Sequence, residues 1–168
     1  TNIFSMNSVW DPDVTNLGHQ PMVFDTYAGI YDRYRVHGSR LRVRFMPNPT
    51  SDTGLIGPYT FGICGSDSSS GFPSLPSTRM EQSDSIWTTV NRQTGPVELD
   101  WTFEPEWKLG VTTEDDVQSA AVTASPTQRY YAHVWWADIT GPLSSTGYIT
   151  VEIDYTVEFF QLKQSAQS

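Results

Sequence analysis

The chain has 168 residues, of which 38% are hydrophobic and 13% aromatic, and its formal net charge is -9 at pH 7. This hydrophobic content excludes a disordered chain, and no apolar run approaches the ~20 residues that span a bilayer, so we expect one domain over residues 1–168 with no membrane partner. The single cysteine, Cys64, excludes an internal disulfide framework, and 19 acidic against 10 basic residues predict long-range repulsion of nucleic acid.

The first residues are predicted to form a strand and then a short helix. A weak strand pattern lies within Asn2–Trp10. Asp25 can cap a short helix that ends near His37 and Gly38. The apolar face of this helix follows the i, i+3, i+4, i+7 spacing and consists of Tyr27, Ile30, Tyr31 and Tyr34.

The segment Arg40–Phe45 alternates apolar and basic residues, which is the period of a half-buried strand. One face of this strand consists of Leu41, Val43 and Phe45, and the other of Arg40, Arg42 and Arg44. An acidic chain thus places three of its ten basic residues on one face of one strand. We therefore expect this row of arginines to contact groups of opposite charge.

Six further strands are predicted from the same alternation. They are Tyr59–Cys64, Ser85–Val90, Val97–Phe103, Val117–Thr123, Arg129–Asp138 and Ile149–Phe159. The strand at Arg129–Asp138 has large apolar side chains on both faces, so we expect each face to be covered at least in part. Long connections rich in Gly, Pro, Ser, Thr and Asp separate the strands at residues 66–85, 109–116 and 140–147.

Eight strands with long loops and one short helix indicate an all-β, two-sheet fold. Among such folds, the eight-stranded antiparallel jelly-roll sandwich occurs in viral capsid, lectin and cupin domains. We therefore predict a jelly roll and separate these functions by their chemistry.

A metal site of the cupin type needs histidines that converge on one ion. The three histidines, His19, His37 and His133, are isolated from one another in the sequence and include no His-x-His pair. We therefore predict no metal site of this kind and no cofactor.

Glycoside hydrolysis needs two carboxylates that face each other across a cleft. Glu104 and Glu106 flank a proline at a strand end, and the acidic run at 114–116 lies in a polar loop. We interpret both groups as solvated surface charge and predict no enzyme activity. A calcium site at the acidic run, or at Asp11 and Asp13, stays open, although no EF-hand spacing supports it.

Sugar binding of the lectin kind would use an exposed aromatic ring beside polar groups. Trp107, or one of Trp135 and Trp136, could provide that ring. Large aromatic residues in a β-sandwich more often belong to the core or to an interface. A carbohydrate-binding module is therefore the alternative function.

The stretch GHQPMVFDTYAGIYDRYRVHGSRLRVRF, residues 18–45, resembles a region near the start of capsid proteins from small circular single-stranded DNA viruses that encode a replication initiator. In that family a G-x-QP-M segment leads into a short aromatic helix, a Tyr-x-Val tail and a Gly-Ser strand with alternating basic residues. The positions that match are Gly18, Gln20, Pro21, Met22, Tyr31, Tyr34, Val36, Gly38 and Ser39.

Later parts of the chain resemble the same family. SPTQRYYAHVWWAD, residues 125–138, is similar to its penultimate strand, and VEIDYTVEFFQLK, residues 151–163, to its last. Lys108, Leu109 and Gly110 resemble a recurring loop motif. The loop at 66–85 has no counterpart in this resemblance.

The resemblance implies a coat protein whose identical copies, sixty in a T=1 icosahedral shell, enclose single-stranded DNA. It implies location in the virion, with assembly in the host nucleus or cytoplasm, and a host receptor of unknown kind. It also implies a basic amino-terminal arm that binds the genome, which this sequence does not show. Sixty such domains would carry a large negative charge, so packaging would depend on that arm.

Two sets of residues are predicted to make contacts in such a shell. Arg40, Arg42 and Arg44 are expected to meet either phosphates inside the particle or carboxylates of a neighbouring subunit, and the row of Glu152, Asp154 and Glu158 is the most regular candidate for the latter. Tyr27, Tyr31 and Tyr34 are expected at a subunit interface. The open alternative is that the tyrosines close the core of their own subunit and the arginines are solvated.

Overall fold

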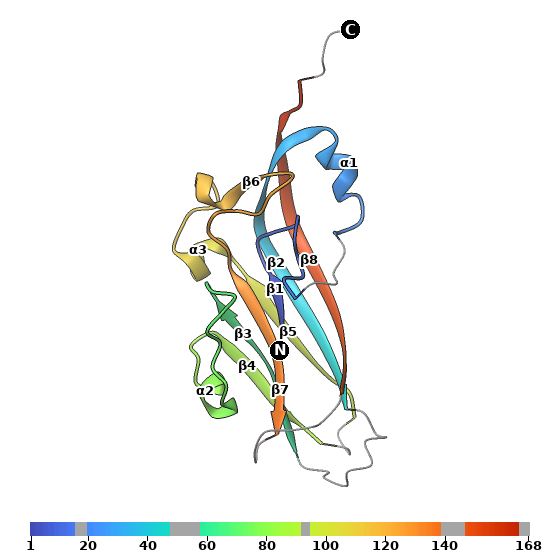
Figure 1. Cartoon of the computed structure of the whole chain (residues 1–168), viewed down its shortest axis with the longest axis vertical. Helices are drawn as coiled ribbons and strands as arrows, with labels where there is room; N and C mark the ends of the chain where they lie inside the picture. Colours follow the sequence, from blue (N-terminus) through green and yellow to red (C-terminus); the bar gives the residue numbers. More distant parts are fainter. Residues whose placement is uncertain (16–19, 48–57, 92–94, 139–146, 165–168) are drawn as a thin grey trace.

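The computed structural model of the chain describes residues 1–15, 20–47, 58–91, 95–138 and 147–164 (Figure 1). Its strands form two antiparallel sheets of four strands each. Sheet A has the order β1 (Asn2–Ser5), β7 (Tyr131–Asp138), β3 (Tyr59–Ser66) and β4 (Ser85–Val90). Sheet B contains β5 (Val97–Phe103), β2 (Tyr31–Pro47), β6 (Ser119–Ala121) and β8 (Gly147–Leu162).

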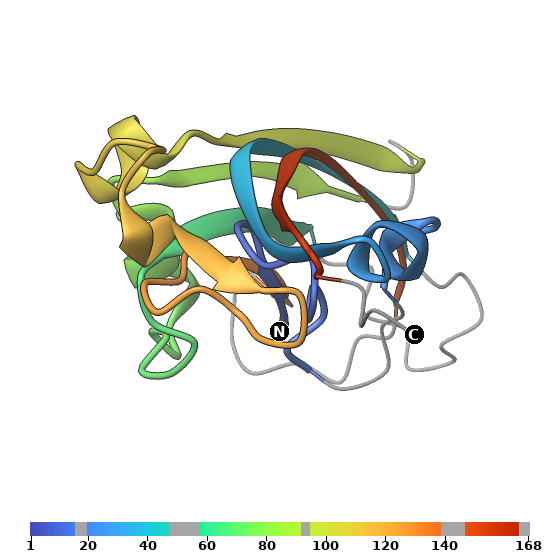
Figure 2. The ribbon, with the colours of Figure 1, turned by 90° about the horizontal axis from the view of Figure 1, so that it is seen from above.

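Early strands of the chain pair with late ones. The long strand β2 pairs with the last strand, β8, and β3 pairs with β7 in the other sheet. On its other side β2 pairs first with β6 and then with β5. This nested antiparallel pairing across two layers is that of a jelly roll, and it confirms the predicted fold class (Figure 2).

The main core fills the space between the two sheets. The alternation in β2 turns Leu41, Val43 and Phe45 inward, where all three are buried. The rings of Phe45 and Phe61, one from each sheet, stack with their centroids 5.1 Å apart. The alternation of apolar and polar residues therefore places apolar side chains from both sheets in one layer between them. Burial of this apolar surface is the dominant stabilising contribution in a sandwich.

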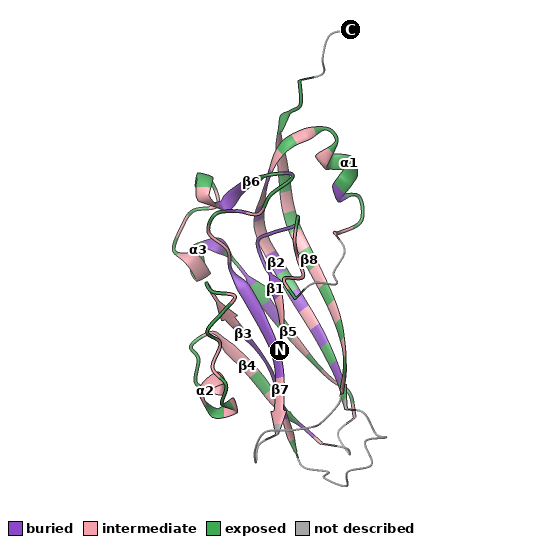
Figure 3. Ribbon diagram, in the orientation of Figure 1, coloured by how far each residue is buried: buried purple, intermediate pink, exposed green. Residues whose placement is uncertain are grey.

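A smaller apolar cluster fills one end of the sandwich, where α1 (Phe24–Ala28) packs against β2 and β8. Its buried members are Val9, Phe24, Tyr34, Val36, Ala120 and Val122. Figure 3 shows α1 as mostly exposed, and Phe24 is its buried residue. This cluster holds the helix at the end of sheet B.

The helix predicted from Asp25 to near His37 is wrong beyond Ala28. The chain turns at Gly29, and β2 begins at Tyr31, because Tyr31 and Tyr34 enter the ladder with β8. Tyr34 and Val36 are buried, whereas Arg35 between them is less so, which is the period of a strand. The spacing of Tyr27, Tyr31 and Tyr34 favours a helix, but pairing with the long neighbouring strand β8 favours the extended form.

Other boundaries also differ from the predictions. Two further helices, α2 (Pro76–Met80) and α3 (Pro105–Leu109), each begin with a proline at the first helical position. The strand predicted at Val117–Thr123 is a 3-10 turn, η1 (Asp116–Gln118), followed by the short β6. These segments are too short for hydrophobic periodicity to identify them.

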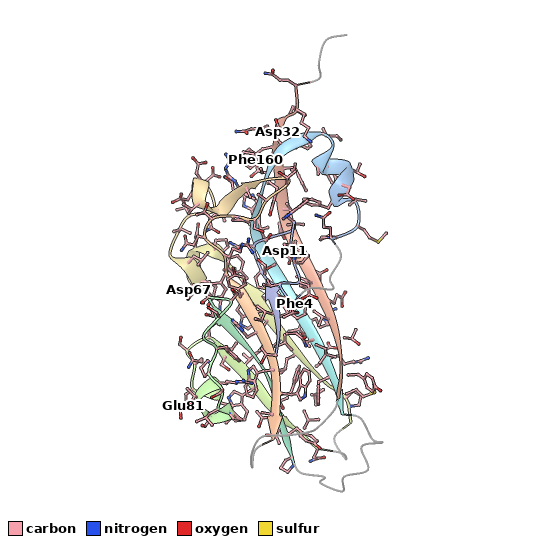
Figure 4. All side chains as sticks on the ribbon, in the orientation of Figure 1. Phe4, Asp11, Asp32, Asp67, Glu81 and Phe160 are labelled. Atoms are coloured by element: carbon pink, nitrogen blue, oxygen red, sulfur yellow. The ribbon has the colours of Figure 1, made fainter. Side chains whose placement is uncertain are left out.

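The loop between β3 and β4, residues 67–84, covers the outer face of sheet A; Figure 4 labels Asp67 near its start and Glu81 just after α2. His133 and Trp135 point away from the main core and are nevertheless fully buried. The predicted covering of both faces at Arg129–Asp138 is thus confirmed for these side chains. Gly62 lies beneath the indole of Trp135, where an added Cβ would lie 2.7 Å from a ring carbon.

Within the described ranges, the structure contains no helix that is both long enough and apolar enough to cross a membrane.

Candidate functional site

The arginine row lies on the outer face of sheet B, on its central strand. Arg42 is opposite Asp100 of β5 and Glu152 of β8, and Arg44 is opposite Glu98 of β5. The register therefore places basic side chains in the middle of the sheet, between two acidic strands. We call this surface the arginine face, which consists of Arg40, Arg42, Arg44, Glu98, Asp100, Glu152 and Asp154.

Ion pairs connect the arginine face across all three strands. Arg40 Nε donates to Asp100 Oδ1 at 2.9 Å, and Arg42 Nη1 donates to Glu152 Oε2 at 2.8 Å. Arg42 Nε also lies 3.5 Å from Asp100 Oδ1, and Arg44 Nε lies 3.7 Å from Glu98 Oε2. The hydrogen bond and the charge of Glu152 raise the pKa of Arg42 above its ordinary value.

The arginine face as a whole is not a positive patch. Its three guanidinium groups stand among four carboxylates of the same chain, so the local charge does not favour an anion. All the pairs are accessible to solvent, so each is expected to contribute little to stability. A contact of these arginines with phosphate or with a neighbouring subunit stays a prediction.

Two more arginines continue the row beyond an irregularity in β2 between Val36 and Gly38. The guanidinium carbons of Arg33 and Arg35 lie 5.9 Å and 4.8 Å from the ring centroid of Phe160, which Figure 4 labels near the end of β8. Arg35 also pairs with Glu114 at 3.2 Å. The sequence places these two arginines in the predicted helix, so their alignment with the row was missed.

The three predicted interface tyrosines have different environments. Tyr34 is fully buried, and its hydroxyl lies 3.3 Å from Ser8 Oγ and donates to the carbonyl of Ala124 at 3.0 Å. Tyr34 therefore closes the core of its own subunit and is removed from the predicted contact surface. Tyr27 is exposed and stacks on Phe159 with centroids 5.1 Å apart, and Tyr31 lies beside the same ring.

Tyr27 and Tyr31 border a groove between α1 and β8, with a volume of about 470 Å³. The segment just before α1 presents Met22 and Val23 to solvent, with exposed fractions of 87% and 65%. On the β8 side the groove is lined by Ile153, Tyr155, Val157 and Phe159, together with the acidic Asp154. An exposed apolar surface of this kind is typical of a contact site.

In the part of the chain that the structure describes, the carboxylate and histidine candidates from the sequence have different environments. Glu104 and Glu106 are exposed at the start of α3. His37 pairs with Glu158 at 3.0 Å, and His19 lies outside the described residues. Where the structure describes the chain, no three metal-ligating side chains come together.

The aromatic candidates for sugar binding also divide by burial. Trp107 on α3 is 86% exposed, whereas Trp135 is fully buried and Trp136 packs partly into the main core. Trp107 is therefore the one of the three whose ring is largely free for a ligand.

A polar centre that the sequence did not reveal lies at the start of β4. The carboxylate of Asp84 accepts hydrogen bonds from Trp101 Nε1 at 3.2 Å and from the hydroxyl of Tyr130 at 2.8 Å, and it pairs with Lys108. Burial and this hydrogen bond raise the pKa of Tyr130. The Lys-Leu-Gly motif thus has a structural role, since Gly110 also ends α3 with φ at 68°.

No protein-family model and no curated protein matches the sequence. Among solved structures, the chain is similar to one of Desmodium yellow mottle tymovirus, with 13% identity, 99% of this chain and 75% of that chain covered, and a TM-score of 0.38. It is similar to a picornavirus capsid, from an expanded equine rhinitis A virus particle, with 10% identity, coverage of 98% and 67%, and a TM-score of 0.43. For tobacco necrosis virus the identity is 17%, the coverage 96% and 86%, and the TM-score 0.42.

Proposed function

We propose that the chain is a viral coat-protein subunit, whose identical copies assemble into a closed icosahedral shell around a single-stranded DNA genome. The observation that carries the proposal is the apolar surface around α1. This surface belongs to residues 20–45, the stretch whose sequence resembles coat proteins, and it leaves Met22, Val23 and Tyr27 exposed. A soluble monomer gains nothing from such a surface, whereas an assembling subunit covers it.

The groove between α1 and β8 suits the kind of contact that a shell needs. In a closed shell each surface patch meets a different patch of its neighbour. A groove lined by Tyr27, Tyr155 and Phe159 offers aromatic side chains, which are enriched in the buried centres of interfaces. We propose that a neighbouring subunit fills this groove.

The size of the particle in solution tests the proposal. A T=1 shell of sixty copies forms a megadalton species in light scattering and a round particle of uniform size in electron microscopy. A monomer or dimer under all assembly conditions would contradict it. If that monomer or dimer also binds a glycan array, and a Trp107→Ala variant does not, the result would favour the carbohydrate-binding module over the coat protein.

Genome binding is proposed for a basic segment rather than for the arginine face. The support is the charge balance on that face, where Arg40, Arg42 and Arg44 are already paired with carboxylates of their own chain. A basic arm of the kind implied by the resemblance would supply phosphate contacts that these residues do not.

Replacing all three arginines with glutamine tests this assignment. We expect assembled particles to retain their nucleic-acid content, measured by the ratio of absorbance at 260 and 280 nm. A lower content, together with a weaker salt dependence of DNA binding, would show that the arginines contact phosphates. If the variant assembles only at high ionic strength, where the carboxylates left without their arginines are screened from one another, the arginines form ion pairs between subunits.

Within this proposal the protein is located in the virion after assembly in the host nucleus or cytoplasm. Immunogold labelling of infected cells distinguishes the two compartments.

A further inference from the structure

The loop between β3 and β4, residues 67–84, closes over His133 through a stack of rings. The ring of Phe72 lies on the imidazole of His133, with centroids 4.4 Å apart and planes only 5° from parallel. The guanidinium of Arg79 lies 4.8 Å from the Phe72 centroid and 5.4 Å from that of Trp135. Arg79 Nε also donates to the carbonyl of Pro73 at 2.6 Å, which fixes α2 to the rest of the loop.

The hydrogen bond of His133 fixes which tautomer its neutral ring adopts. Nε2 lies 2.9 Å from the carbonyl oxygen of Ser68, and because a carbonyl only accepts, Nε2 must carry the proton. The other ring nitrogen, Nδ1, is buried without a hydrogen-bond partner. Protonation would therefore bury a second N–H group with no acceptor, which is costly.

The charged groups around His133 disfavour its protonation as well. Burial lowers its pKa most; the bond to Ser68 opposes this, and the positive charge of Arg79 on α2 lowers the pKa further. From β3, Cys64 lies directly opposite His133, and burial raises the pKa of its thiol to about 11, so it provides no negative charge near neutral pH. A proton on His133 would thus be repelled by the nearby guanidinium of Arg79.

We propose that this loop is a pH-sensitive cover, which leaves the outer face of sheet A when His133 is protonated. With the loop released, His133 regains an ordinary pKa near 6.5, above its value under the closed loop. Protons therefore bind the open form first, and the closed form loses stability as the pH falls through 6.5 towards the lower pKa of the closed state. The device belongs to the single subunit and does not depend on shell assembly.

Cys64 is a built-in reporter of this opening. It is the only cysteine, it is buried, and its position opposite His133 places it under the same loop. Its reaction with 4,4'-dithiodipyridine, a disulfide that reacts with thiols in acid, is measured from pH 7.5 to pH 4.5. After division by the rate for the urea-unfolded chain at each pH, we expect the rate to rise about tenfold or more.

Two matched substitutions assign the effect. His133→Gln retains an N–H donor for the Ser68 carbonyl but does not titrate, so its normalised rate is expected to be independent of pH. His37→Gln makes the same change at the half-exposed histidine that pairs with Glu158, and it is expected to retain the full rise. A flat profile in the unmodified chain, or an equal rise in His133→Gln, would overturn the proposal.

Hydrogen exchange in the unmodified chain provides a second test that needs no variant. Below pH 6.5, amides of residues 67–84 are expected to lose protection while those of β3 and β7 retain it. Equal protection of the loop at pH 7.5 and pH 4.5 contradicts the cover, and simultaneous loss in the strands shows global unfolding instead.

Discussion

The carboxylate of Asp84 connects the two sheets at the end where α3 begins. It lies just before β4 of sheet A and accepts from Trp101 of sheet B, from Tyr130 before β7 and from Lys108 of α3. Its side chain is only 21% exposed, so water has little access to replace the carboxylate as the acceptor for these donors. One residue thus satisfies three donors that come from three different segments.

Replacement of Asp84 by alanine is expected to lower the free energy of unfolding by about 2–3 kcal/mol, because the lysine and two buried donors lose their acceptor. Urea denaturation measures the change. The control is Asp100→Ala, which removes an exposed carboxylate of the arginine face and should cost less than about 1 kcal/mol. Equal losses in the two variants would show that Asp84 has no special role.

Gly65 is required by the same centre. A Cβ at this position would lie 2.0 Å from Asp84 Oδ2 and 2.8 Å from ring carbons of Trp101 and Tyr130. We expect Gly65→Ala to lower the melting temperature by several degrees, since either the carboxylate or the rings must move. Gly29→Ala is the comparison, because an added Cβ there meets only carbonyls of α1 at 3.3 Å or more. Similar melting temperatures for both variants would contradict the steric argument.

At the level of the elements, alternation predicted the long strands because each buries one face and exposes the other. The last strand shows this best: exposed Glu152 and Asp154 alternate with partly buried Val151 and Ile153. The predicted helix was wrong beyond Ala28 because the tyrosine spacing alone favours a helix, whereas pairing with β8 holds the segment from Tyr31 onward in a strand. Covering of the face that carries His133 and Trp135 was predicted from their large side chains, but the loop that covers it was not, since no local pattern indicates that a polar loop folds back onto a sheet.

The arginine face illustrates the same limit for a candidate site. The sequence identifies Arg42 and, separately, the acidic alternation at Glu98, Asp100 and Glu152, but it does not provide the register that aligns them. That register depends on how the core faces of three strands pack together. The basic and acidic strand faces were therefore predictable from the sequence, whereas the pairing of the arginines with carboxylates of the same chain was not.

A double-mutant cycle measures this pairing between strands. Arg42→Gln and Glu152→Gln, singly and together, should give a small favourable coupling free energy at low salt, because the pair is well oriented but exposed. The coupling should largely vanish in 1 M NaCl, since exposed charges are screened. The cycle of Arg44 with Thr150, its uncharged neighbour on β8, should show no salt-dependent coupling. A salt-independent value for Arg42 and Glu152 would point to packing rather than charge.

For the whole molecule, the exposed surfaces differ in chemistry. At one end of the sandwich α1 and β8 form the groove lined by aromatic and aliphatic side chains, whereas on the outer face of sheet B the arginines are paired with carboxylates of the same chain. Sheet A is closed off by its own loop. The groove is therefore the surface on which a hydrophobic contact between subunits gains most, and the proposed shell depends on it.

Met22→Ser combined with Tyr27→Ser tests that dependence. Both side chains are exposed in the single subunit, and Tyr27 also stacks on Phe159, so the free energy of unfolding should fall by no more than about 1–2 kcal/mol. If a neighbour covers them, loss of about 1–2 kcal/mol per contact should raise the protein concentration needed for assembly at least tenfold, as measured by light scattering. Leu75→Ser, at another exposed apolar side chain beside α2, should assemble as the unmodified protein does. An unchanged threshold in the double variant would place the subunit contacts elsewhere on the molecule.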